Sequence, residues 1–122
     1  MIIAITATGQ TMNSQVDPRF GRAAYFLIGN SEIMDFGVFE NKNVTAGGGA
    51  GINSAKVVID AGAEAVLTGN CGPNAERTLR AAGVKLYTGV KGTAAEALKL
   101  FLDGNLKEAD GPNVQSHFGT GN

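Results

Sequence analysis

The chain has 122 residues, a length that predicts one domain with a hydrophobic core of its own. Its 10 basic and 11 acidic side chains leave a formal net charge of −1, so it offers no overall basic field and we expect no nucleic-acid partner. No stretch approaches the roughly 20 apolar residues of a membrane helix, and the first residues lack the pattern of a signal peptide. Because a single cysteine cannot form an internal disulfide bond, we expect a cytoplasmic protein without a membrane partner.

The first part of the chain predicts three strands. Residues 2–6 are apolar and rich in β-branched side chains, residues 24–28 form a second apolar run, and residues 33–40 alternate loosely between apolar and polar. Short connections allow these strands to pair antiparallel.

In the second part of the chain, strands alternate with helices. A helical pattern after residue 51 precedes a strand at 65–67, and a helix beginning at Pro73 precedes a strand at 84–87. The last helix begins behind the capping box Thr93-Ala-Ala-Glu96 and ends at Gly104. The order βββαβαβα predicts a single α/β domain over residues 1–104, with a mixed five-stranded sheet and flanking helices. Residues 105–122 are polar and glycine-rich, and we expect them to form a flexible C-terminal tail.

A glycine-rich segment leads into the first predicted helix and is a candidate binding loop. Gly48, Gly49 and Gly51 would let a ligand approach the backbone where the helix N-terminus favours an anion. The segment matches neither the dinucleotide-binding nor the Walker pattern. The alternative is a flexible loop of small residues.

Residues 68–74, Thr-Gly-Asn-Cys-Gly-Pro-Asn, follow a strand and open a helix, the position at which α/β sheets bind ligands. Asn74 is a candidate ligand contact there. Cys71 lies beside the expected helix start, where a thiolate is favoured, so it is a candidate metal ligand. It could instead be a nucleophile, although no base accompanies it, or a small residue in a tight turn.

Arg19 and Arg22 flank Phe-Gly in the loop after the first strand and could together neutralise an anionic ligand. Alternatively, they serve solubility, or one pairs with Asp17. His117 is either a solvated side chain of the tail or a ligand that closes over a bound metal group.

Four segments together resemble the dinitrogenase iron–molybdenum cofactor biosynthesis family, which includes NifX, NafY and the C-terminal domain of NifB. They are the first strand, Val-Asp-Pro-Arg-Phe-Gly-Arg at 16–22 with the Ala-Tyr-Phe that follows, the glycine loop, and Gly-x-x-Gly-Pro-Asn-Ala at 69–75 with Ala-Gly-Val-Lys-Leu-Tyr at 82–87. The resemblance covers roughly residues 1–104, and the two longer blocks make it specific. It implies a ribonuclease H-like fold, a link to nitrogen fixation, and binding or carrying of an iron–sulfur-type cluster without catalysis.

The residues and the resemblance together predict a small non-catalytic module that holds an iron–sulfur or iron–molybdenum-type cluster or its precursor, and that exchanges it with a donor or acceptor protein. Such clusters are usually anionic and take thiolate or imidazole ligands, which makes Cys71 and His117 the candidate metal ligands. The candidate cofactor contacts are Arg19, Arg22, Gly48, Gly49, Gly51 and Asn74. The alternative is a regulatory or protein-interaction domain of the same fold that binds a small anion without metal. An enzyme that uses Cys71 is a weaker third interpretation.

Overall fold

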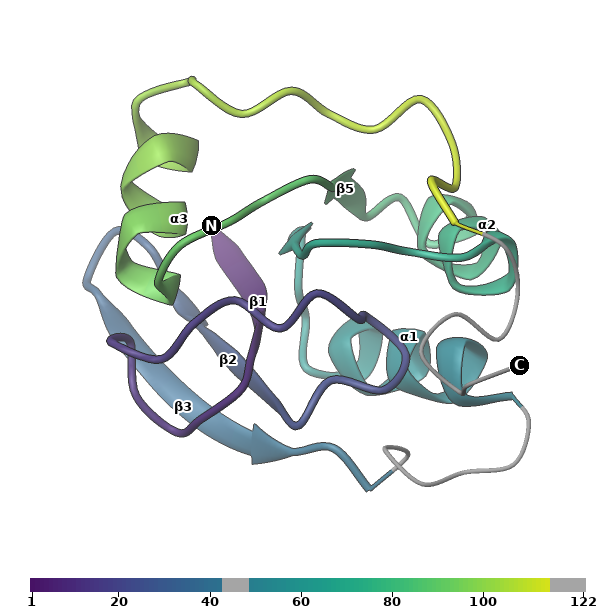
Figure 1. The fold of residues 1–122 in the computed structure, drawn as a ribbon, viewed down its shortest axis with the longest axis horizontal. Helices are drawn as coiled ribbons and strands as arrows, with labels where there is room; N and C mark the ends of the chain where they lie inside the picture. Colours follow the sequence, from purple (N-terminus) through teal and green to yellow (C-terminus); the bar gives the residue numbers. More distant parts are fainter. Residues whose placement is uncertain (43–48, 115–122) are drawn as a thin grey trace.

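Five strands form one mixed sheet in the order β3-β2-β1-β4-β5 in the computed structural model, which describes residues 1–42 and 49–114 (Figure 1). β1 (Ile2–Ala7), β2 (Tyr25–Asn30) and β3 (Asp35–Glu40) pair antiparallel. β4 (Ala65–Leu67) and β5 (Lys85–Tyr87) run parallel to β1. The predicted α/β fold and its element order are thus confirmed.

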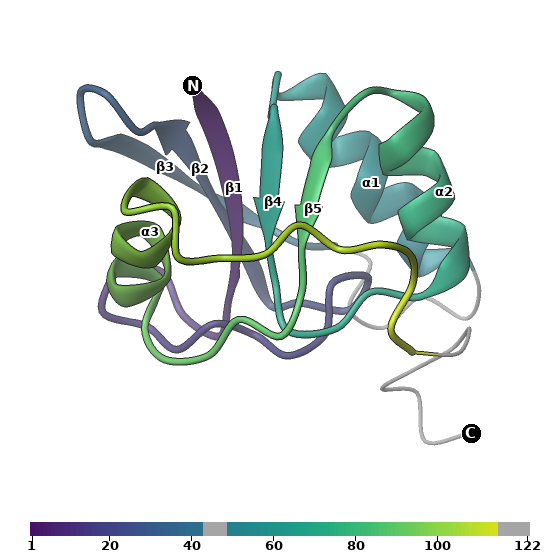
Figure 2. The same ribbon diagram turned by 90° about the horizontal axis from the view of Figure 1, so that it is seen from above.

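The helices form the outer layers of the fold (Figure 2). α1 (Ala50–Asp60) and α2 (Pro73–Ala81) cover one face of the sheet, and α3 (Ala94–Leu102) covers the other. Alternate residues of β1 point to opposite faces, as the pleat of a strand requires. Ala4 therefore packs under α1 and α2, whereas Ile3 and Ile5 pack under α3. No helix in the described part of the chain is long and apolar enough to span a membrane.

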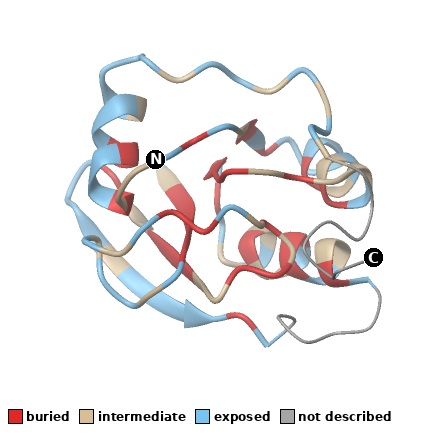
Figure 3. Cartoon of the chain, in the orientation of Figure 1, coloured by how far each residue is buried: buried red, intermediate tan, exposed pale blue. Residues whose placement is uncertain are grey.

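Local sequence explains where most elements begin. Thr93 and Glu96 form the predicted capping box, in which the Thr93 hydroxyl accepts from the Glu96 backbone N–H and the Glu96 carboxylate accepts from the Thr93 backbone N–H. Pro73 occupies the start of α2, as predicted. The third strand is shorter than expected: it begins at Asp35, because the preceding residues form the turn, in which Met34 has a φ of 56°. Figure 3 shows buried residues along the central strands and an exposed β3.

Residues 105–114, the first part of the predicted flexible tail, contact the folded domain, and we call them the C-terminal strap. Figure 2 shows the strap crossing from α3 to α2 beside β5. The Ala109 backbone N–H donates to the Leu86 carbonyl at 2.8 Å, and Glu108 forms a β-bridge with Tyr87. The physical reason is that β5 is an edge strand whose backbone groups need partners. Residues 115–122, including His117, lie outside the described residues.

Candidate functional site

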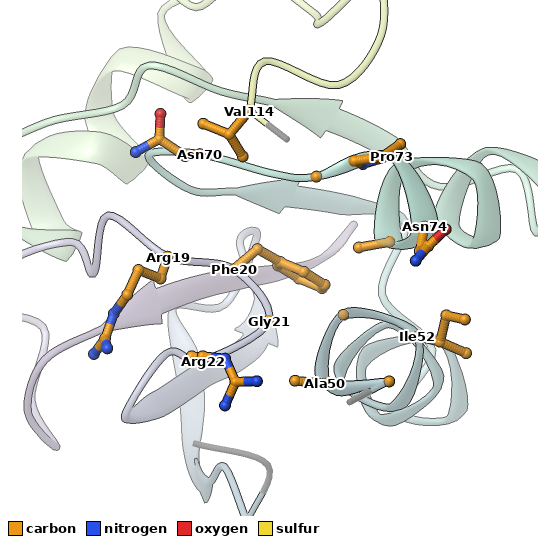
Figure 4. Close-up of a pocket in the computed structure, with 14 residues that line it drawn as sticks. Arg19, Phe20, Gly21, Arg22, Ala50, Ile52, Asn70, Pro73, Asn74 and Val114 are labelled. Atoms are coloured by element: carbon orange, nitrogen blue, oxygen red, sulfur yellow. The ribbon is translucent and has the colours of Figure 1, made fainter. Parts of the chain in front are cut away.

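A pocket lies where the N-termini of α1 and α2 meet the loop after β1 (Figure 4). Its volume is about 580 Å³, open solvent at its mouth included. Most of the predicted contact residues line it together: Arg19, Arg22, Gly49, Gly51 and Asn74. The structure therefore brings to one place residues that are far apart in the sequence. Gly48 lies outside the described residues.

Two helix N-termini converge on this pocket. Gly49 precedes α1 and Gly72 precedes α2, and neither helix start receives a hydrogen bond from a capping side chain within the described residues. The convergence depends on small side chains, because a Cβ atom on Gly51 would lie only 3.2 Å from the Cβ atom of Ala75. The first backbone N–H groups of a helix have no intrahelical partner, and the helix dipole is positive at this end. The pocket is thus suited to an anion.

Asp17 fixes the loop that carries the arginines. Its carboxylate is only 2% exposed. One carboxylate oxygen accepts from the Arg19 backbone N–H at 3.0 Å and lies 3.4 Å from the Arg19 Nε, and the other accepts from the Ala24 backbone N–H at 3.1 Å. A buried carboxylate that accepts hydrogen bonds from several N–H groups holds the backbone of its loop in one conformation. The acid of the Asp-Pro-Arg block is therefore a structural residue.

The middle of the same loop is anchored to α1. The carbonyl of Gly21 accepts from the Asn41 amide at 3.1 Å and from the Ser54 hydroxyl at 2.8 Å. A Cβ atom on Gly21 would lie 3.0 Å from the backbone of Gly51, so glycine is needed for this close approach. Phe20 is buried and its ring packs against that of Phe26, with centroids 5.8 Å apart. These contacts leave the arginine side chains to form the pocket wall.

The two arginines occupy different environments. The Arg19 side chain is 33% exposed and remains paired with Asp17, which matches the alternative interpretation of this residue while still leaving it in the pocket wall. Arg22 is only 8% exposed, and Figure 4 shows its guanidinium group beside Ala50 at the start of α1. A cation in this position adds to the positive end of the helix dipole. Arg22 therefore places a positive charge inside the pocket lining, at the start of α1 (Figure 4).

Residues 1–104 match the dinitrogenase iron-molybdenum cofactor family. The chain belongs to this family. An uncharacterised protein of Methanocaldococcus jannaschii is 31% identical over 99 residues, which are 79% of this chain and 84% of the relative. The family is one of cofactor-binding and carrier proteins, and its members' activity is binding rather than typical enzyme catalysis.

Solved structures of similar proteins agree with the fold. The apo form of the orange protein from Desulfovibrio gigas is 42% identical, with a TM-score of 0.90 over 93% of this chain and 96% of that one. A Thermotoga protein provisionally named as a NifB protein is 38% identical, with a TM-score of 0.77 over 88% of this chain and 91% of that one. The predicted resemblance to NifX-like and NifB-like proteins is thereby confirmed.

The environment of Cys71 differs from the one that the sequence predicts. Its side chain is 1% exposed and belongs to the core under α1 and α2. Burial, with a smaller contribution from the nearby Glu76 carboxylate, raises the pKa of the thiol from 9.0 to about 12. The expectation of a favoured thiolate at the helix start is wrong, because loss of solvent outweighs the helix dipole here. The placement fits a neutral core residue.

Several residues of the site were not singled out by sequence reasoning. Asn70 and Val114 line the pocket, and Asn113 is hydrogen-bonded to the loop before α2. Asn70 lies inside the block that the family resemblance singled out, so its position in that block was an available signal. Asn113 and Val114 lie beyond the matched segment, in a stretch whose composition indicates only a loop.

Proposed function

We propose that this protein binds and carries an anionic metal–sulfur cluster, of the iron–sulfur or iron–molybdenum type, in the pocket between α1 and α2. The observation that carries the proposal is the convergence of two helix N-termini, which no side chain of the described residues caps, and of the Arg22 guanidinium on one open pocket. Backbone N–H groups and guanidinium groups are strong donors to anions. Membership of the cofactor family supports a cluster as the anion.

The pocket offers hydrogen-bond donors and positive charge to an anion, and not side chains that coordinate a metal ion directly. Among the described residues, no three His, Cys, Asp or Glu side chains lie close enough together to hold a metal ion. Cys71 is buried and neutral, so it is poorly placed to supply a thiolate. We therefore infer that the cluster arrives already assembled and that hydrogen bonds and charge retain it. His117 remains a candidate ligand outside the described residues.

A carrier must release its cargo to a partner. Retention by hydrogen bonds and charge suits release, because no metal–ligand bond to the protein has to break. An apo form of the similar orange protein is compatible with a group that can leave. We propose that the partners are the proteins that donate and accept the cluster, and that the exchange takes place in the cytoplasm.

The alternative function is a domain that binds a small anion without metal. The same pocket chemistry favours it, since helix N-termini and arginines bind phosphate and sulfate as readily as other anions. The carrier proposal expects a metal–sulfur anion to bind more tightly than an oxyanion of equal charge, whereas the alternative does not.

The test uses anaerobic incubation of the protein with metal–sulfur species formed beforehand in solution from iron, sulfide and molybdate, followed by desalting, metal analysis and visible absorption. Parallel titrations with tetrathiomolybdate and molybdate compare two tetrahedral dianions that differ only in sulfur and oxygen. We expect retained molybdenum, a visible absorption band, and tighter binding of tetrathiomolybdate. Binding of phosphate or molybdate with no retention of a metal–sulfur species would contradict the carrier function and favour the alternative.

A further inference from the structure

Asn113 of the C-terminal strap clamps the loop that precedes α2. Its side-chain oxygen accepts from the Cys71 backbone N–H at 2.7 Å, and its own backbone N–H donates to the Cys71 carbonyl at 3.1 Å. Its amide nitrogen donates to the Asn70 side-chain oxygen at 3.0 Å and reaches the Gly69 carbonyl at 3.3 Å. One side chain thus holds three successive residues of this loop.

Asn70 links this loop in turn to the loop after β1 that carries Arg19 and Arg22, which we call the arginine loop. Its amide nitrogen donates to the Pro18 carbonyl at 2.9 Å, and its backbone carbonyl accepts from the Phe20 N–H at 3.0 Å. The side-chain amide can make the bond to Pro18 only with its nitrogen turned toward that carbonyl. The donor from Asn113 fixes this orientation, because it requires the oxygen of Asn70 on the opposite side.

The strap also reaches the pocket itself. Val114 lines the pocket next to Asn70, on the side opposite Arg22 (Figure 4). The strap is bound along β5 through the Ala109 N–H and to α2 through the Arg80 guanidinium, which donates to the Asp110 carbonyl at 3.0 Å. Asn113 is therefore the point at which an anchored segment meets the loop before α2, and Asn70 links that loop to the opposite wall.

We propose that Asn113 is a positioning residue of the cluster pocket, and that the strap sets the affinity for anionic cargo although it lies beyond the segment shared with the family. Asn113 acts through Asn70 and Cys71, which place the N-terminus of α2 and the arginine loop at a fixed separation. This inference rests on the proposed function of the pocket.

The experiment compares full-length wild type with Asn113→Ala and with Asn105→Ala as the matched control. Asn105 lies at the start of the strap with an exposed side chain, outside the pocket lining. Tetrathiomolybdate is the probe, and its dissociation constant is measured together with amide hydrogen exchange of Cys71. We expect Asn113→Ala to weaken binding about three- to tenfold, the range that loss of one or two ordinary hydrogen bonds predicts, and to speed exchange at Cys71. Asn105→Ala should change neither.

A second variant, Asn113→Asp, tests whether a charge at position 113 acts on the bound anion. The free energy of unfolding of each variant, measured beside its dissociation constant, separates positioning from a general loss of stability. Asn113→Asp keeps the acceptor for the Cys71 N–H but cannot donate to Asn70, and it adds a negative charge beside an anion pocket. We expect its binding deficit to exceed that of Asn113→Ala at low salt and to shrink as salt is added. Equal dissociation constants for wild type and Asn113→Ala would overturn the positioning role, whatever the effect of Asn113→Asp, and leave the proposed function intact. Failure of the wild type itself to bind the probe would overturn both.

Discussion

Gly69 and Pro18 pack backbone against backbone: a Cβ atom on Gly69 would lie 2.6 Å from the Cα atom of Pro18 and 3.0 Å from its carbonyl oxygen. The bridge between Arg19 and Asn70 continues the same contact. Two loops that are about fifty residues apart in the chain therefore meet backbone to backbone, next to the pocket-lining residues Arg19 and Asn70.

Gly69→Ala should destabilise the fold by roughly 1–3 kcal/mol or more, because the added methyl group meets rigid backbone rather than a side chain that can turn away. The measurement is the free energy of unfolding in urea. Gly111→Ala is the matched control, since a Cβ atom there meets no described atom within 4 Å, and it should stay within about 0.5 kcal/mol of wild type. Equal stability of the two variants would contradict the close contact.

Arg22→Gln should weaken binding of tetrathiomolybdate by about tenfold or more, because it removes a charged and largely buried side chain from the pocket wall. Arg19→Gln should have a smaller effect, since this guanidinium is more exposed and partly neutralised by Asp17. Arg77→Gln on the exposed part of α2 removes the same charge away from the pocket and serves as the control. A loss in Arg77→Gln as large as that in Arg22→Gln would show that only net charge matters.

Cys71→Ala should retain binding of the cluster probe, because the thiol is buried in the core and the pocket donors are elsewhere. In the wild type, alkylation of Cys71 by iodoacetamide at pH 8 should be slow in the folded protein and fast in urea, since only the thiolate reacts and burial keeps the thiol neutral. Mass spectrometry measures both rates. Loss of colour in Cys71→Ala with an unchanged melting temperature would instead identify the cysteine as a metal ligand.

The stability of the wild type should fall above pH 9 partly because of Cys71. The pKa of the thiol is raised from 9.0 to about 12 in the folded state, so the unfolded state loses this proton first as the pH rises. The stability contributed by the neutral buried thiol is therefore complete below pH 9 and is lost as the pH rises toward 12. Melting temperatures of wild type and Cys71→Ala between pH 7 and 11 isolate this effect from other titrating groups. We expect the wild type to lose more over this interval.

The fold could be predicted because its signals are local. The apolar, β-branched run of β1, Pro73 at the start of α2 and the capping box of Thr93 and Glu96 each follow from a few neighbouring residues, and each is found in the structure. Association of the strap with β5 could not be predicted in this way. It depends on backbone groups that become available only after β5 has formed an edge, and backbone groups leave no mark in the side-chain pattern.

The candidate site, like the fold, has some residues that could be predicted from the sequence and others that could not. Gly49, Gly51 and Asn74 could be selected because loops before helices have a general chemistry, and Arg19 and Arg22 because paired guanidinium groups suit an anion. The structure brings all five together at one pocket. Cys71 had the same position relative to its helix, but its burial depends on the packing of distant segments against it. The role of Asn113 depends on hydrogen bonds across more than 40 residues of sequence, which no local spacing reveals.

The strap that reaches Asn113 also changes how molecules of this protein can meet each other. By covering β5 it removes one of the two sheet edges at which strands of separate copies could add to each other and polymerise. The other edge strand, β3, begins with Asp35 and ends with Glu40. If two copies paired these strands antiparallel in full register, each Asp35 would face a Glu40, and the like charges would repel. The strap thus protects one edge of the sheet from aggregation, and the charges at the two ends of β3 protect the other.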